Sequence, residues 1–292
     1  MKRIDEPTLS AENLIRKCVD RSSKSNKKSA ERLIAPMLSA SATYENVVRN
    51  GASSICQINK ASFSGSSKDD NDVAKALYQR QRSRLGEFEQ IKGNMRCPYC
   101  GVNHANQLDH YLPKADYQYL SVTPLNLIPC CQRCNGVKRA TAFTAQQAET
   151  VLFNPYIEDF DDERWLTVSI AETPTEKGKL PAFIFSVTAV KPSGWSKEKF
   201  ERLRHSFSTL KISEQYSELW VDDCNSWSTS FCELWDKYRD KKNPARKILK
   251  RKYKYCDDYG NKNYYQKWAL KAALKSDWFC YESMPKWLGI SQ

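Results

Sequence analysis

Two Cys-x-x-Cys pairs constrain this 292-residue chain more than any other feature of its sequence. The pairs are Cys97 with Cys100 and Cys131 with Cys134, and 30 residues separate them. Each pair turns two thiolates toward one point, and two pairs complete the all-sulfur shell of a structural Zn²⁺ site. The identity of one ligand is open, because Cys130 could replace Cys131. The two-residue spacer to Cys134 favours Cys131. The alternative is a set of unrelated buried or redox-active cysteines.

The segment between the pairs carries side chains suited to phosphodiester cleavage. Asp109 and His110 are adjacent, Asn126 precedes the second Cys pair, and Asn135 follows it directly. A neutral imidazole can take a proton from water near pH 7. Carboxylate and amide oxygens suit Mg²⁺ or Mn²⁺ better than zinc. Neighbouring residues of a strand point to opposite faces, so Asp109 and His110 reach one phosphate only if the chain bends there.

In this order, and between two Cys pairs, these residues resemble the HNH nucleases, the zinc-braced branch of the His-metal finger superfamily. The resemblance spans residues 93–143 and implies an HNN variant of the embedded ββα-metal finger. It implies that His110 is the general base and that Asn126 holds the loop orienting that histidine. It also implies that Asp109 and Asn135 bind a catalytic Mg²⁺ or Mn²⁺. Cleavage in that family leaves 5′-phosphate and 3′-hydroxyl ends.

Positive charge gathers toward both ends of the chain and indicates a polyanionic partner. The formal net charge is +12, and residues 1–96 and 241–292 carry most of the excess. Residues 241–255 are the most basic stretch and predict a helix, either solvated or bound to phosphates. Tyr253 and Tyr255 could stack on unpaired bases there. The candidate nucleic-acid contacts are Lys138, Arg139, Lys247, Lys250 and Arg251.

The apolar patterns predict a mainly helical α+β protein in three segments. Residues 1–92 form a helical extension, residues 93–143 the nuclease core with zinc knuckles, and residues 144–292 an α+β extension with a β-hairpin. Further expectations are a helix at 10–20, a basic linker or arm at 21–29, a helix at 29–50 interrupted near Pro36, a loop at 62–72, a helix at 70–92 capped by Asp70 or Asp72, strands at 165–171 and 182–190, and helices at 196–240 and 264–275.

The sequence predicts a cytoplasmic protein with no membrane partner, because it contains neither a long apolar run nor an apolar signal core at its start. The scattered cysteines fit a reducing compartment. The chain carries no Walker A motif, so any ATPase would be a separate partner.

The sequence thus predicts a metal-dependent endonuclease that acts on DNA or, less favoured, RNA. HNH proteins of this size with helical extensions resemble effector nucleases of bacterial anti-phage systems, such as Septu-type and retron-linked nucleases. A restriction-type or mobile-element nuclease remains open. The competing hypothesis is a catalytically inactive zinc module that binds nucleic acid or a protein partner.

Overall fold

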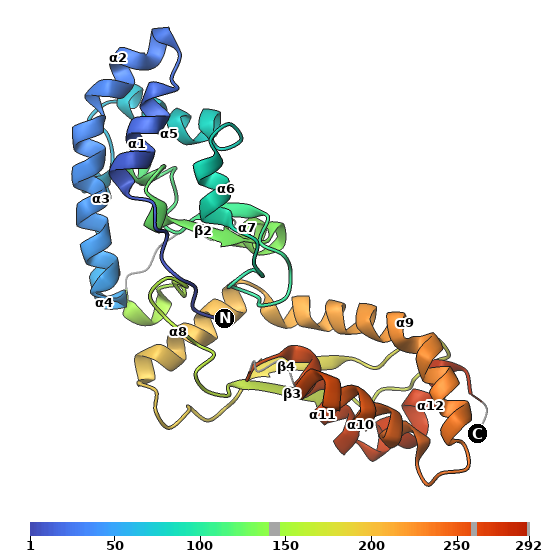
Figure 1. Ribbon diagram of the computed structural model, residues 1–292. Coiled ribbons are helices and arrows are strands. Elements are labelled where there is room, and N and C mark those ends of the chain that lie inside the picture. The colour runs from blue at the N-terminus through green and yellow to red at the C-terminus, as the bar shows by residue number, and fades with distance from the viewer. Residues whose placement is uncertain (140–146, 258–261, 291–292) are drawn as a thin grey trace. The chain divides into compact units, whose positions relative to one another are not determined.

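A computed structural model describes residues 1–139, 147–257 and 262–290, without the side chains of Arg139 and Asp257. The described chain is mainly helical with small two-stranded sheets, which confirms the predicted α+β class at this level (Figure 1). It forms two compact units. The first comprises residues 1–160 and 201–210, and the second comprises residues 161–200 and 211–292. The three segments expected from the sequence divide the chain at other positions.

Helices open the first unit. The Ser10 hydroxyl caps the first of them by accepting a hydrogen bond from the Asn13 amide, and Ser67 caps the fifth through Asp70. Ser67 thus takes the position expected of Asp70 or Asp72. The elements are α1 (Ala11–Asp20), α2 (Lys24–Arg32), α3 (Ile34–Arg49), α4 (Ala52–Cys56), the 3₁₀ turn η1 (Lys60–Phe63), α5 (Lys68–Gln81) and α6 (Gly86–Lys92).

Three sequence expectations are wrong in this region, and the first is the loop at 62–72, because α5 begins at Lys68. The expected linker at 21–29 is largely helical, because α2 begins at Lys24 and packs against α5. Arg32 at the end of α2 forms 2.7 Å ion pairs with Asp69 and Asp70. The helix expected over 70–92 is interrupted, since residues 82–85 separate α5 from α6. Tertiary contacts rather than apolar spacing therefore decide where these helices form.

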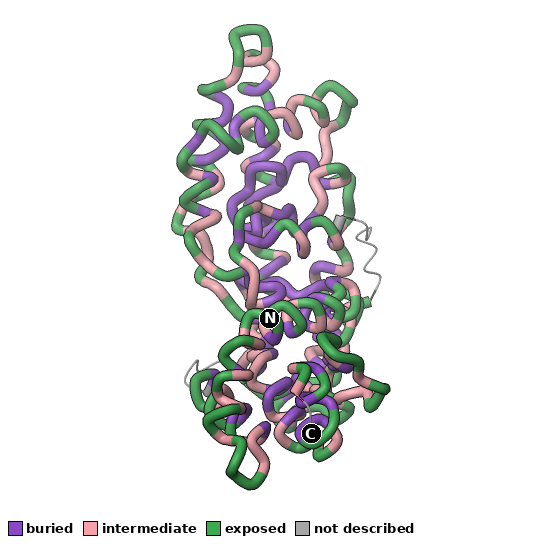
Figure 2. Tube along the Cα trace, turned by 90° about the vertical axis from the view of Figure 1, so that its right-hand side faces the viewer, coloured by how far each residue is buried: buried purple, intermediate pink, exposed green. Residues whose placement is uncertain are grey.

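A short antiparallel sheet lies at the centre of the first unit. Strand β1 (Gln107–His110) pairs with β2 (Leu127–Cys130), with His110 opposite Leu127. All four residues of β2 are buried, and α6 packs against it. Helix α7 (Gln132–Arg139) follows at once and packs against β1. Figure 2 shows buried segments gathered inside this unit. The connecting 3₁₀ turns are η2 (Gln118–Leu120), η3 (Pro124–Asn126) and η4 (Ala148–Thr150).

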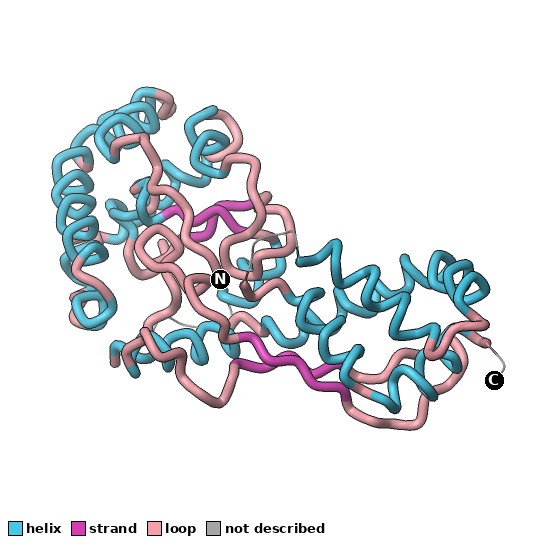
Figure 3. Tube along the Cα trace, turned by 60° about the horizontal axis from the view of Figure 1, so that its bottom comes forward, coloured by secondary structure: helices cyan, strands magenta, loops and turns pink. Residues whose placement is uncertain are grey.

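The second unit contains the other antiparallel pair, as the predicted hairpin requires (Figure 3). Strand β3 (Leu166–Ile170) pairs with β4 (Phe183–Val187), and the alternating Phe183 and Phe185 are buried. Helix α9 packs against β4 and α11 against β3. The remaining elements are α8 (Lys197–Thr209, whose residues from 201 belong to the first unit), α9 (Ile212–Tyr238), α10 (Pro244–Asp257), α11 (Tyr265–Lys275), the π-helical turn η5 (Phe279–Ser283) and α12 (Met284–Leu288).

The helix expected over 196–240 is two helices. Lys211 separates α8 from α9 and takes a left-handed backbone conformation with φ of 49°. Such a conformation is uncommon outside glycine, asparagine and aspartate and cannot continue a right-handed helix. Among the described residues, no helix has both the length and the apolar character that crossing a bilayer requires.

Candidate functional site

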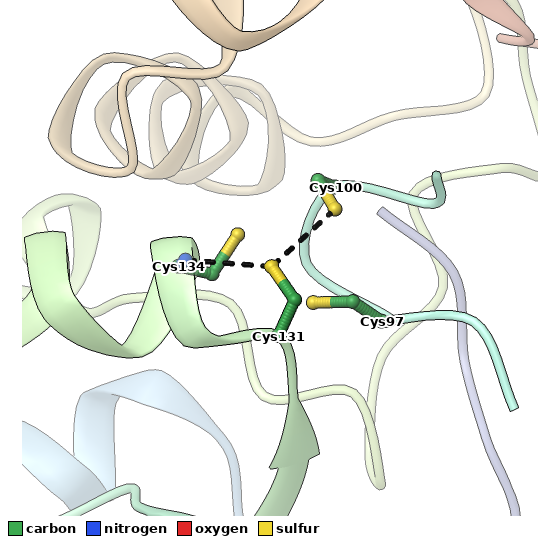
Figure 4. A group of neighbouring side chains, drawn as sticks. All are labelled: Cys97, Cys100, Cys131 and Cys134. Atoms are coloured by element: carbon green, nitrogen blue, oxygen red, sulfur yellow. Dashed lines mark hydrogen bonds between the residues drawn. The ribbon is translucent and has the colours of Figure 1, made fainter. Parts of the chain in front are cut away.

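The four cysteines of the two Cys-x-x-Cys pairs meet in one buried cluster, with their side chains converging in Figure 4. Their Sγ atoms all lie within 4.8 Å of one another. The Sγ atoms of Cys100 and Cys131 are 4.0 Å apart. Sulfurs that each lie about 2.3 Å from one zinc ion stand about 3.8 Å apart in a tetrahedron. The predicted ligand set is therefore confirmed as a group that could hold zinc.

The structure also resolves which of two neighbouring cysteines belongs to this cluster. Cys131 is a member, whereas Cys130 lies in β2 opposite Gln107. Hydrogen bonds from the other thiols, first that of Cys100, lower the pKa of Cys131. Burial raises the pKa of the Cys130 thiol. The position of the Cys131 sulfur inside the cluster, and not of the Cys130 sulfur, resolves the ligand identity left open by the sequence.

Asp109 lies on β1 and makes a buried ion pair. Its Oδ2 atom lies 2.6 Å from the Lys138 ammonium and accepts a hydrogen bond from the Tyr99 hydroxyl at 3.1 Å. Lys138 also donates to the backbone carbonyls of His110 at 2.8 Å and Tyr111 at 3.1 Å. An ammonium has three hydrogens to donate, so these oxygens satisfy it. Lys138 thereby ties α7 to the end of β1, and the predicted phosphate contact stays a prediction.

His110 ends β1 with its imidazole held on one side. Its Nε2 atom lies 2.9 Å from the Ser121 carbonyl oxygen. A carbonyl only accepts, so Nε2 carries a proton, and in the neutral form of the ring the lone pair lies on Nδ1. The Tyr78 ring packs edge-on against the imidazole, with 4.4 Å between ring centroids. The ring thus has a fixed tautomer and a restricted orientation.

Asn126 is fully buried and clamps the segment that follows His110. Its Oδ1 accepts from the Leu112 amide at 2.8 Å, and its Nδ2 donates to the Leu112 carbonyl at 3.1 Å. The same Nδ2 donates to the Leu120 carbonyl at 3.2 Å. The side chain therefore replaces backbone partners at both ends of the segment from Leu112 to Leu120.

Asn135 lies on α7, directly after a member of the four-cysteine cluster. Its Nδ2 donates to Gln107 Oε1 at 2.5 Å, which turns its own Oδ1 away from that partner. Gln107 and Asp109 share one face of β1, because side chains alternate along a strand. Helix α7 thus meets this face twice, through Asn135 at Gln107 and through Lys138 at Asp109.

These side chains line one cleft of the first unit, about 890 Å³ in volume. Asp109, His110, Asn135 and Lys138 all contribute to its wall, and Asn126 lies outside it as a support. Asp109 and His110 reach the same cleft although they are neighbours on a strand, because β1 ends at His110. Further cations in the lining are Arg82, Lys92 and Lys114.

Two residues near this cleft have no signal in the sequence. His205 lines the cleft from α8. Burial, followed by the nearby Arg202 cation, lowers the pKa of His205 and favours the neutral ring. Tyr99, between the first two cysteines, reaches Asp109. Only folding brings these side chains to the site.

Three other residues predicted to contact nucleic acid do not line this cleft. Lys247, Lys250 and Arg251 are exposed on α10 of the second unit. The side chain of Arg139 lies outside the described residues. His104 does not line the cleft and hydrogen bonds to Asn94 Oδ1 at 2.7 Å.

Comparison with known proteins identifies one phage relative. Over 152 residues the chain is 30% identical to Protein ea31 of Escherichia phage lambda. The aligned region is 51% of this chain and 46% of that protein, so the chain spans about half the length of this relative. No protein-family model matches the chain, and no solved structure matches it.

Proposed function

We propose that the first unit is a metal-dependent endonuclease of the HNH type that hydrolyses phosphodiester bonds in nucleic acid. The observation that carries this proposal is the single cleft lined by His110, Asp109 and Asn135. Cys134 of the metal cluster directly precedes Asn135 in the sequence. The order β1, β2, α7 fits the ββα-metal finger expected from the resemblance.

His110 would serve as the general base. Its Nε2 proton is held by the Ser121 carbonyl, so Nδ1 is the nitrogen that takes a proton from the attacking water. The Tyr78 ring limits rotation of the imidazole. Asn126 fixes the backbone two residues further on, which keeps the end of β1 in place.

Asp109 and Asn135 would hold the catalytic cation. Among the described residues, Asp109 Oδ1 accepts no hydrogen bond, and the Asn135 amide directs its Oδ1 away from Gln107. Hard oxygen donors of this kind suit Mg²⁺ or Mn²⁺. When bound, such an ion would stabilise charge on the phosphoryl oxygen and on the departing 3′ oxygen. Arg82 and Lys114 add positive charge around the substrate phosphates, whereas the charge of Lys92 is balanced by its ion pair with Glu89.

A specific observation also favours the competing function, a catalytically inactive zinc module that binds nucleic acid or a partner. The Lys138 ammonium already neutralises Asp109, so the carboxylate does not require a divalent ion for charge balance. We rank this second, because it leaves the convergence of His110 and Asn135 on the same cleft without a role.

The experiment compares His110→Ala with His104→Ala in the full chain. Each variant is incubated with supercoiled plasmid, linear DNA and tRNA in Mg²⁺ or Mn²⁺. Loss of the general base should slow cleavage by roughly 10² to 10⁴, whereas His104→Ala should cleave like the wild type. Equal rates in wild type and His110→Ala would refute the assignment. Absence of cleavage on every substrate would favour the inactive module.

The biological setting extends this proposal. DNA is the favoured substrate, and the activity would suit the cytoplasmic effector of a bacterial anti-phage system. Because the sequence carries no Walker A motif, an ATPase of that system would be a separate chain. Co-purification of this protein with an ATPase encoded beside it would test the assignment.

A further inference from the structure

We propose that one face of α10 in the second unit docks the phosphate backbone of duplex nucleic acid. We call this face the basic stripe and define it by Lys247, Lys250, Arg251 and Lys254. All four residues are exposed. The choice of partner rests on the proposed nuclease function, but the geometry of the surface does not.

The basic stripe follows helical spacing. Its members stand at positions i, i+3, i+4 and i+7, which places them on one side of a helix that turns about 100° per residue. From Lys247 to Lys254 the helix rises about 10 Å. One strand of duplex DNA carries a phosphate about every 3.4 Å along the axis, so this length faces about three phosphates.

The opposite side of α10 fixes the direction in which the basic stripe points. Ala245, Ile248, Leu249 and Cys256 are buried. The helix packs against α11 and α9. Because its apolar side is occupied inside the second unit, α10 cannot turn its cations inward.

Internal contacts separate structural cations of α10 from available ones. Arg246 ion-pairs with Asp277, and the Lys252 ammonium lies 3.9 Å above the centre of the Trp227 ring. Across the described ranges, none of the four stripe side chains forms an ion pair with a carboxylate. The stripe therefore presents four charges that the fold does not use.

The chemistry favours nucleic acid over a membrane surface. A helix that lies on a bilayer turns an apolar face toward the lipid. The aliphatic face of α10 is already buried, and its exposed face is cationic apart from one exposed aromatic side chain, Tyr255. Lysine and arginine without apolar anchors are typical of contacts to a phosphate backbone, which carry no sequence preference.

The test measures binding of a fluorescein-labelled DNA duplex to the full-length His110→Ala protein as salt is raised from low to physiological concentration. The test variant replaces the four stripe residues with glutamine. The control replaces four exposed cations elsewhere in the second unit with glutamine, namely Lys177, Lys197, Lys237 and Lys286. Both variants lose the same charge.

We expect the stripe variant to bind at least tenfold more weakly at physiological salt. The slope of log affinity against log salt should fall by about 3 to 4, since each phosphate contact contributes about 0.9. The control should change affinity less than threefold and leave the slope unchanged. Equal losses in both variants, or none in either, would overturn the proposal. So would stripe-dependent binding to phosphatidylserine vesicles without binding to DNA.

This outcome can be separated from that of the nuclease proposal. If the otherwise wild-type protein cleaves DNA and the stripe variant binds DNA normally, the docking proposal is refuted and the nuclease proposal is supported. If the protein cleaves no substrate but binds DNA through the basic stripe, the nuclease proposal is refuted and the docking proposal is supported. The double variant Lys250→Gln/Arg251→Gln, with a smaller expected slope change of about 2, provides a second test should the fourfold variant fold poorly.

Discussion

The Lys138 ammonium lies 2.6 Å from Asp109 Oδ2, and both side chains are 7% exposed. This pair joins α7 to β1 at the wall of the cleft. Asp109 is also the candidate ligand of a divalent ion. An ammonium and a metal ion beside the same carboxylate repel each other, so Lys138 should set how tightly the cleft binds metal.

The first prediction concerns Lys138→Met. Removing one partner leaves a buried charge without compensation, which should lower the free energy of unfolding by about 3 to 5 kcal/mol. Mn²⁺ should restore part of this loss, because it can take over the charge of the ammonium. Thermal unfolding with and without MnCl₂ measures both effects.

The matched control for that prediction is Asp109→Asn/Lys138→Met, which leaves no unpaired charge at the site. Mn²⁺ should raise its melting temperature far less than that of Lys138→Met. If Mn²⁺ stabilises the two proteins equally, Asp109 is not a metal ligand.

The second prediction concerns the four-cysteine cluster. Cys134→Ser should release zinc and unfold the region around α7, because structural zinc sites contribute folding energy. Cys130→Ala is the control, since Cys130 is buried beside the cluster but is not part of it. Metal analysis of both purified proteins measures the zinc content directly. A zinc-replete Cys134→Ser, or a zinc-free Cys130→Ala, would contradict this ligand set.

The third prediction concerns Asn126→Ala. The substitution leaves the Leu112 amide and carbonyl without their partner, whereas the Leu120 carbonyl keeps its hydrogen bond from the Thr123 amide. Each unsatisfied buried group costs about 1 to 3 kcal/mol, so urea unfolding should show a loss of at least that size. Cleavage should also fall, because the end of β1 loosens.

Asn50→Ala is the control for Asn126. Asn50 makes its side-chain hydrogen bond to Asn46 at the surface, and such substitutions change stability by about 0.5 kcal/mol or less. Similar unfolding free energies for the two variants would show that the buried clamp contributes little.

The fourth prediction concerns pH. Burial, followed by the Glu87 carboxylate, raises the pKa of Cys18 from its ordinary value of 9.0 to about 12. The folded protein therefore keeps the proton where the unfolded chain loses it. The protonated Cys18 thiol therefore contributes to the free energy of unfolding in full below pH 9. This contribution is lost as the pH rises toward 12, at up to about 1.4 kcal/mol per pH unit.

Urea unfolding at about pH 8.5 and about pH 10.5, on either side of the ordinary thiol pKa, measures this effect, with Cys18→Ala for comparison. The wild type should lose more stability between the two pH values than the variant does. An identical loss in both proteins would mean that Cys18 is not responsible. The difference between the two proteins isolates Cys18, because other buried thiols also titrate in this range.

Local spacing explains what could be predicted from the sequence. The two Cys-x-x-Cys pairs can be recognised as one metal-ligand set, because the spacing of each pair places two sulfur ligands within one turn of the chain. Asn126 directly precedes β2 and Asn135 lies on α7, and their roles at a catalytic site stay predictions. The basic helix α10 could be expected from its composition. Its first residue, Pro244, is a residue type that is favoured in the first turn of a helix.

Contacts between distant segments explain what could not be predicted. Helix α2 is polar apart from the buried Ala30, and its packing on α1, α3 and α5 and the Arg32 ion pairs indicate it. His205 reaches the cleft from α8, a segment with no motif. The pairing of Lys138 with Asp109 depends on how α7 sits on β1, which helical spacing alone does not determine.

Cys134 and Asn135 are consecutive residues of α7. A single residue inserted between them would rotate the Asn135 side chain by about 100° around the helix axis relative to Cys134. The Cys134 sulfur could still lie in the four-cysteine cluster, but the side-chain amide of Asn135 would no longer line the cleft. The residues that flank this pair should therefore tolerate substitutions far better than the pair tolerates a change in spacing, and natural variants of the chain should preserve the adjacency even where the surrounding residues diverge.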